Sequence, residues 1–336
     1  MIKNSWLFAF TLAIALIGSS KADAGDAVQL LNVSYDPTRE LYSDLNARFV
    51  ANYEKETGRK LTIKQLHGGS SQQARTVIEG VPADVVTLAL PSDIEGLRKY
   101  GLVADGWQQR LPNGSRPYTS TIVFVVRKGN PFGIKDWPDL VRPGITVVTP
   151  NPKTSGNGKL SFLAAWGSVT ERGGSEDAAR AFEKALYEHA IVGDAGARGA
   201  TITFANEKIG DVQLTWENEA LREVEQLKGD LEIVYPPISI QAEPSITWVD
   251  ANVIRHGSEA EAKAYLQFLY SGEAQEIIAQ HGYRPIDPET LHRHAKLLPP
   301  LELFSIKAIA KDWDDAQQKF FAENGVFDGI YTPRSR

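Results

Sequence analysis

Apolar and polar positions alternate along the chain in blocks. Short apolar runs predict buried strands, and they fall at residues 28–33, 61–63, 83–90, 121–126, 144–148, 212–216 and 231–235. Stretches with a helical apolar stripe lie between them or follow them, at 36–57, 71–79, 156–168, 176–188 and 217–227. From residue 259 onward the pattern is mostly helical. Strands that alternate with helices predict an α/β fold with parallel sheets.

Several helix starts carry their own signals. Asp36 before Pro37 predicts a helix that the Asp36 side chain caps, and Gly58 is placed to end that helix in a left-handed conformation. Ser92 and Glu95 have the spacing of a capping box, which predicts the start of another helix.

The first 24 residues predict an export signal. Lys3 precedes an apolar run at 6–17, and Ala22-Asp23-Ala24 resembles a cleavage site. A membrane anchor is the alternative, but this run has twelve residues, whereas a spanning helix needs about 20. A lipid anchor requires a cysteine, and the chain has none. We therefore expect a soluble protein without a lipid anchor in a bacterial periplasm.

Composition narrows the function further. The 336 residues include 36 Lys and Arg against 42 Asp and Glu, a net charge of −6. A chain without cationic excess is not expected to bind nucleic acid. The absence of cysteine excludes thiolate catalysis, cysteine-ligated zinc and iron–sulfur clusters. The length suggests two domains.

Motifs of two enzyme classes are incomplete. Residues 156–159 read GNGK, but a phosphate loop would need glycine at Lys153 and serine or threonine at Leu160. Residues 67–69 read HGG, as in an esterase oxyanion loop, yet the chain has no G-x-S-x-G nucleophile motif. His292 and His294 are close in sequence, and we interpret them as part of a solvated face rather than a metal site. We therefore expect no catalytic residue, no metal and no cofactor.

Turns lead from strands into helices at 35–37, 67–71 and 151–159, and the last two contain glycine and serine. In open α/β sheets such turns bind anions, because helix N-termini present free N–H groups and a positive dipole end. Glycine and serine are also common in tight turns that bind nothing. The turns alone leave both interpretations open.

Seven segments carry a family resemblance in chain order. They are LLNVSYDPTRE at 30–40, HGGS at 67–70, ADVVTLA at 83–89, YTSTIVF at 118–124, TPNPKTSG at 149–156, GARG at 196–199 and WENEA at 216–220. Together they resemble the periplasmic sulfate-binding proteins of bacterial sulfate and thiosulfate ABC importers. The resemblance implies a two-lobed type II periplasmic binding fold, with two open α/β sheets joined by a hinge of two crossovers. Lobe one would comprise 25–118 plus 249–336, and lobe two 119–248.

The resemblance also implies a function. The protein would be a monomeric, non-enzymatic solute-binding protein that captures sulfate between its lobes and delivers it to the membrane permease of an ABC importer. A thiosulfate, phosphate or molybdate binder of the same fold is the alternative, and an exported ester hydrolase is a more distant one.

The same resemblance assigns ligand-binding roles. Sulfate would be held by backbone N–H groups of Asp36 and Ser70, by the Ser155 hydroxyl, by N–H groups of Gly156, Asn157 and Ala197, and by the indole N–H of Trp216, with Arg198 supporting the site from outside. From the residues alone, Trp216 could equally be core and Asp36 only a helix cap. Sulfate carries no proton at neutral pH, so a pocket of donors satisfies it, whereas the O–H of hydrogen phosphate would cost about 1–3 kcal/mol if left unpaired.

One position departs from the family pattern. Where the family usually has a second glycine, this chain has Asn157. A backbone N–H survives the change, but the amide side chain adds a carbonyl acceptor to the predicted site. Such an acceptor would admit a protonated or larger oxyanion, such as phosphate or thiosulfate.

Overall fold

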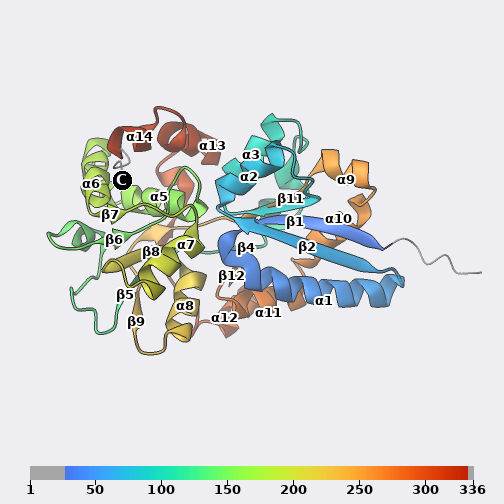
Figure 1. Ribbon diagram of the computed structural model, residues 1–336, viewed down its shortest axis with the longest axis horizontal. Helices are drawn as coiled ribbons and strands as arrows, with labels where there is room; N and C mark the ends of the chain where they lie inside the picture. The colour runs from blue at the N-terminus through green and yellow to red at the C-terminus, as the bar shows by residue number, and fades with distance from the viewer. Residues whose placement is uncertain (1–26, 332–336) are drawn as a thin grey trace, which may run out of the picture.

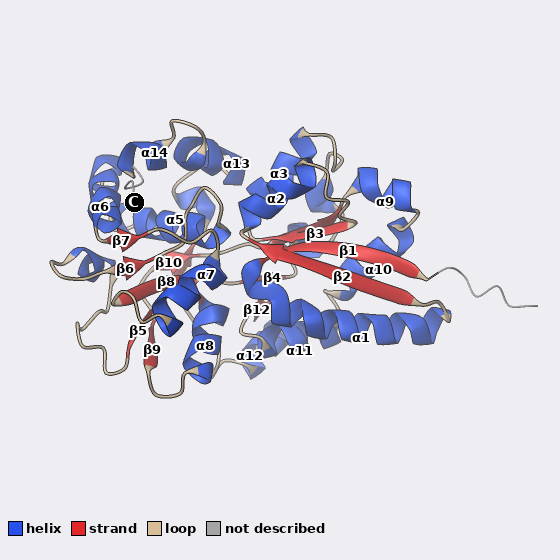
Figure 2. Cartoon of the chain, in the orientation of Figure 1, coloured by secondary structure: helices blue, strands red, loops and turns tan. Residues whose placement is uncertain are grey.

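The computed structural model describes residues 27–331 and shows two lobes, each built around one β-sheet (Figures 1 and 2). The predicted export signal at residues 1–24 lies outside the described residues. No helix within 27–331 is long and apolar enough to cross a membrane.

The first lobe contains a four-stranded sheet with the order β11-β3-β1-β2. Its strands are β1 (Val28–Tyr35), β2 (Leu61–Gly68), β3 (Val85–Leu88) and β11 (Ser245–Trp248). Strand β1 is parallel to β2 and β3, while β11 is antiparallel to β3. Helices surround this sheet (Figure 2), namely α1 (Arg39–Thr57), α2 (Ser70–Ile78), α3 (Pro91–Lys99), α9 (Asp250–His256), α10 (Glu259–Phe268) and α11 (Gly272–Gln280).

The second lobe contains a five-stranded sheet with the order β7-β6-β8-β5-β9. Its strands are β5 (Ile122–Arg127), β6 (Val147–Val148), β7 (Ala190–Ile191), β8 (Val212–Trp216) and β9 (Leu231–Val234), and its helices are α5 (Gly156–Thr170), α6 (Glu176–Glu188), α7 (Ala197–Thr201) and α8 (Glu217–Gln226). Strand β6 is parallel to β7 and β8, but β5 is antiparallel to β8 and β9.

The expectation of parallel sheets is confirmed for β1 with β2 and β3 and for β6 with β7 and β8, but it is wrong at β5, β9 and β11. A parallel neighbour needs a crossover connection, usually a helix. Strand β5 instead follows the short strand β4 (Tyr118–Thr119) directly as the chain enters the second lobe. It therefore joins its sheet without a crossover and runs against its neighbours.

The remaining elements join the lobes or cover them. Strand β4 pairs with β12 (Arg284–Pro285), and β10 (Ser239–Ile240) pairs with β13 (Leu303–Phe304). The short helices are α4 (Pro112–Ser115), α12 (Pro288–Arg293), α13 (Trp313–Ala316) and α14 (Val326–Ile330). The segment that contains α13 and α14 lies beside α5 and α6 (Figure 1). There, the ring centroids of Phe320, Phe321 and Phe327 lie 5.5–6.0 Å from that of Phe162 in α5. We retain the limits of the two lobes along the chain as a proposal.

Two predicted caps differ from the structure, and one helix end is confirmed. The turn before α1 begins after Tyr35, so Asp36 lies inside it and makes no side-chain cap. Helix α3 begins at Pro91, which leaves Ser92 inside the helix rather than at its cap. Proline favours the first helical position because its φ is already helical there. Gly58 ends α1 with φ +72°, as predicted.

Candidate functional site

A small cavity lies where the two lobes meet. It is lined by Tyr35, Asp36, Pro37, Gly68, Gly69, Ser70, Ser155, Gly156, Asn157, Ala197 and Trp216. All seven residues that the resemblance assigns to the ligand are in this set, although they come from five separate chain segments. The space within the cavity that the centre of a water-sized sphere can occupy is about 10 Å³, and a single water molecule needs about that much. The cavity therefore suits a small ion rather than an organic molecule.

Helical starts converge on the cavity. The turn before α1 begins at Asp36, α2 begins at Ser70, α5 at Gly156 and α7 at Ala197. The first N–H groups of a helix have no partner within it, and the dipole gives this end a partial positive charge. The arrangement therefore directs uncharged donors of both lobes at one small volume.

Two side chains add donors. The Ser155 Oγ accepts a hydrogen bond from the Gly158 N–H at 3.3 Å, which leaves the Ser155 hydroxyl proton free to be donated. Trp216 is fully buried, and its indole N–H has no hydrogen-bond partner among the described residues. A buried unpaired donor costs about 1–3 kcal/mol. An acceptor placed in the cavity would remove that cost.

The side chains of Ser70 and Asp36 have other partners. The Ser70 hydroxyl donates to Asp93 at 2.6 Å and accepts from the Ala89 N–H at 2.9 Å, so only its backbone N–H remains for a ligand. The Asp36 carboxylate accepts from the Arg39 guanidinium at 3.0 Å. This pairing partly offsets a negative charge that would otherwise repel an anion.

The lining contains no cationic side chain. His67 stands just before this lining, and burial together with the nearby Arg39 charge lowers its pKa to about 4. The histidine is therefore neutral at pH 7. An anion in this cavity would be stabilised by oriented N–H dipoles rather than by a counter-charge.

Glycines allow the lobes to meet around the cavity. A Cβ at Gly69, in the first lobe, would lie 2.5 Å from the carbonyl oxygens of Thr154 and Ala195 in the second. A Cβ at Gly156 would lie 2.5 Å from the Ala89 side chain. Because real Cβ atoms do not approach other atoms this closely, these positions need glycine for the lobes to be together.

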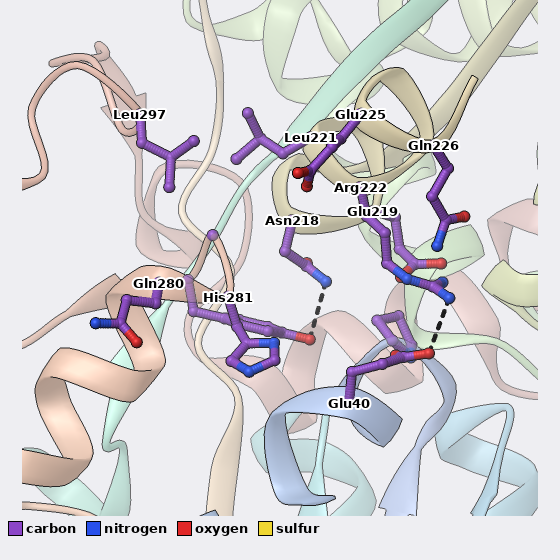
Figure 3. Close-up of a pocket in the computed structure, with 13 residues that line it drawn as sticks. Glu40, Asn218, Glu219, Leu221, Arg222, Glu225, Gln226, Gln280, His281 and Leu297 are labelled. Carbon is purple, nitrogen blue, oxygen red and sulfur yellow. Dashed lines mark hydrogen bonds and ion pairs between the residues drawn. The ribbon is translucent and has the colours of Figure 1, made fainter. Parts of the chain in front are cut away.

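Arg198 lies outside the cavity and connects the lobes. One of its partners, Glu40, is labelled in Figure 3. Its guanidinium donates to Glu40 of α1 at 3.0 and 3.2 Å and to Glu219 of α8 at 3.1 and 3.2 Å. Arg222 adds a second ion pair to Glu40 at 2.9 Å. Burial alone would raise the Glu40 pKa, but the hydrogen bonds and charge of Arg198 lower it overall.

A second connection between the lobes involves Lys159. This lysine is 4% exposed, and its ammonium donates to Ser71 of α2 and to Gln317, both at 2.7 Å. Asp93 lies 3.5 Å from the same ammonium. Sequence reasoning identified neither Glu40 nor Lys159 as part of the site, because each depends on a residue far away in the chain.

A larger pocket, drawn in Figure 3, lies beside the ion pairs of Arg198. Glu40, Arg222 and His281 are among the residues that line it.

Within residues 27–331, no three His, Asp or Glu side chains are grouped so as to hold a metal ion. His294 instead bonds Glu276 at 2.7 Å.

Comparison with known proteins gives consistent matches. The family profile described as bacterial extracellular solute-binding protein matches residues 39–284. A sulfate-binding protein of Salmonella typhimurium is 48% identical over 329 residues, which cover 97% of this chain and 99% of that protein. A thiosulfate-binding protein of Pseudomonas aeruginosa is 46% identical over 327 residues, with coverages of 96% and 98%. The solved structure of the sulfate-binding protein SubI from Mycobacterium tuberculosis matches with a TM-score of 0.79 and 32% identity, and covers 88% of this chain and 99% of that one.

Proposed function

The chain belongs to the bacterial extracellular solute-binding protein family, and we propose that it captures sulfate in the cavity between its lobes. The family and the two-lobed fold predicted from the sequence are thereby confirmed. The near full-length similarity to proteins named sulfate-binding supports sulfate as the ligand.

The observation that carries the proposal is the buried, unpartnered indole N–H of Trp216 beside converging helix starts. Sulfate is a proton-free tetrahedral dianion that can accept hydrogen bonds on all of its oxygens. It would therefore match donors that arrive from several directions. Thiosulfate is the second candidate ligand, because a 46% identical relative bears that name.

We propose a binding role rather than a catalytic one. The space open to the centre of a water-sized sphere is about 10 Å³, which leaves no room for the organic group of a sulfate or phosphate ester beside the anion. The predicted export signal and the family support a periplasmic location, and with it delivery of the bound ion by a monomer to the permease of an ABC importer.

Calorimetric titration of the mature chain tests the proposal. The protein is unfolded, dialysed and refolded to remove any bound ion, and then titrated with sulfate, thiosulfate, phosphate and molybdate in chloride buffer at pH 7. We expect one site per chain with sulfate bound most tightly. No binding of sulfate, or tighter binding of phosphate, would overturn the proposed ligand.

A further inference from the structure

Asn157 adds a side-chain hydrogen-bond acceptor to a cavity whose assigned ligand-binding groups are all donors. It is the second residue of α5, lines the cavity and is 2% exposed. Its Nδ2 donates to the carbonyl oxygen of Leu214 in β8 at 2.9 Å, which fixes the amide. Its Oδ1 is buried and has no partner among the described residues. The side chain thus adds an unpartnered acceptor to the lining, whereas the carboxylate of Asp36, another lining residue, already accepts from Arg39.

We propose that Asn157 is a selectivity residue, whose Oδ1 accepts the O–H of a monoprotonated tetrahedral oxyanion such as hydrogen phosphate. This inference rests on the proposed function and extends its ligand class. Sulfate has no proton to give, so it leaves the Asn157 oxygen unpaired. An ion with one O–H would satisfy both the donors and this acceptor, and the pocket would therefore discriminate less against phosphate than a lining of donors alone.

Tyr35 also lines the cavity, and its hydroxyl has no hydrogen-bond partner among the described residues. That hydroxyl neighbours those of Tyr118 and Tyr283, whereas Asn157 belongs to the helix start that faces the ion. A hydroxyl can also donate to sulfate, so it does not favour a protonated ion. The amide oxygen of Asn157 can only accept, so it is the group that distinguishes a protonated oxyanion from sulfate.

Monofluorophosphate is the probe that isolates the proton. It has the charge and approximate shape of hydrogen phosphate, but fluorine replaces the O–H. We expect the wild-type protein to bind monofluorophosphate about tenfold more weakly than phosphate, since one unpaired buried group costs about that factor. Asn157→Ala and Asn157→Gly keep the backbone N–H but remove the Oδ1 acceptor. In each variant, phosphate binding should therefore weaken about tenfold more than the binding of sulfate or monofluorophosphate does.

Ser161→Ala is the matched control, because Ser161 is buried and unpartnered one turn further along α5 but does not line the cavity. It should change none of the three affinities. Circular dichroism and the melting temperature show whether each variant is folded. The inference is overturned if wild-type protein binds no phosphate, if it binds phosphate and monofluorophosphate equally, or if both Asn157 variants weaken sulfate and phosphate alike. Loss of sulfate binding in the wild type would instead overturn the proposed function.

Discussion

Arg198 of the second lobe holds Glu40 of the first, with two nitrogen–oxygen distances of 3.0 and 3.2 Å. Arg198 directly follows Ala197, whose N–H faces the cavity in the proposed site. The ion pair therefore connects the ligand-facing start of α7 with α1 across the lobe boundary. It exists only while the lobes are together, so it favours the form that encloses the ion.

Glu40→Gln should weaken sulfate binding a few-fold. The substitution removes the charge that Arg198 and Arg222 share, and the effect is modest because the Glu40 side chain is 39% exposed. The difference between wild type and variant should shrink as salt is added. Glu54→Gln is the control, since Glu54 pairs with Lys60 within the first lobe. Equal affinities for wild type and Glu40→Gln at low salt would contradict the role of this ion pair.

Gly69→Ala should reduce sulfate affinity by about a hundredfold or more while leaving the fold intact. The new methyl would meet the carbonyl oxygens of Thr154 and Ala195 at 2.5 Å, so the lobes could not close fully. Small-angle X-ray scattering should show no compaction of the variant with sulfate. Gly96→Ala adds the same methyl where no atom lies within 4 Å, and should bind sulfate normally. A Gly69→Ala variant that closes and binds like wild type would exclude this steric role.

Trp216→Phe should weaken sulfate binding about tenfold or more. It removes the indole N–H, and a hydrogen bond to a charged group contributes about 1.5–3 kcal/mol. Calorimetry of the variant measures the change directly. Trp137→Phe is the matched control, because Trp137 is equally buried but donates its N–H to the Ile238 carbonyl at 2.7 Å. The control should lower the stability of the protein and leave its sulfate affinity unchanged. If Trp137→Phe weakened sulfate binding and Trp216→Phe did not, the ligand would lie elsewhere.

Glu183→Gln should raise stability at pH 7 and make it less dependent on pH. Glu183 of α6 is fully buried, both of its carboxyl oxygens lack partners within residues 27–331, and burial raises its pKa well above the ordinary value. Below pH about 4.3 the carboxyl is neutral folded and unfolded. Above that pH only the unfolded chain ionises, so wild-type stability falls as pH rises.

Thermal unfolding between pH 4 and 8 measures this difference. The gap between Glu183→Gln and wild type should grow with pH, while Glu188→Gln, at the exposed end of the same helix, should follow wild type. A constant gap would show that Glu183 is ionised in the folded protein.

Local signals in the sequence were sufficient for much of the fold. The apolar run at 212–216 predicted β8, the helical stretch at 156–168 predicted the start of α5, and Gly58 was placed at the end of α1. Each depends on a few neighbouring residues. The cap at Asp36 was wrong because the turn begins one residue earlier and Arg39 takes the carboxylate.

Relationships between distant residues required the structure. Glu40 and Arg198 are 158 positions apart, and Lys159 reaches Gln317 across a similar separation. Nothing in their local sequence marks these charged residues as partly or fully buried. The antiparallel direction of β5 likewise depends on how the chain enters the second lobe. The site residues carried over from the family resemblance surround one cavity, and their roles as ligands stay a prediction that the titrations above address.

The close approach that Gly69 and Gly156 permit has a kinetic consequence. With the lobes in contact, the side chains around the cavity are almost fully buried, so we expect a bound ion to leave only when the lobes separate. The residence time of the ion is then set by the lifetime of the closed form rather than by the time needed to break individual hydrogen bonds. A membrane partner that separates the two lobes would therefore cause release of the ion.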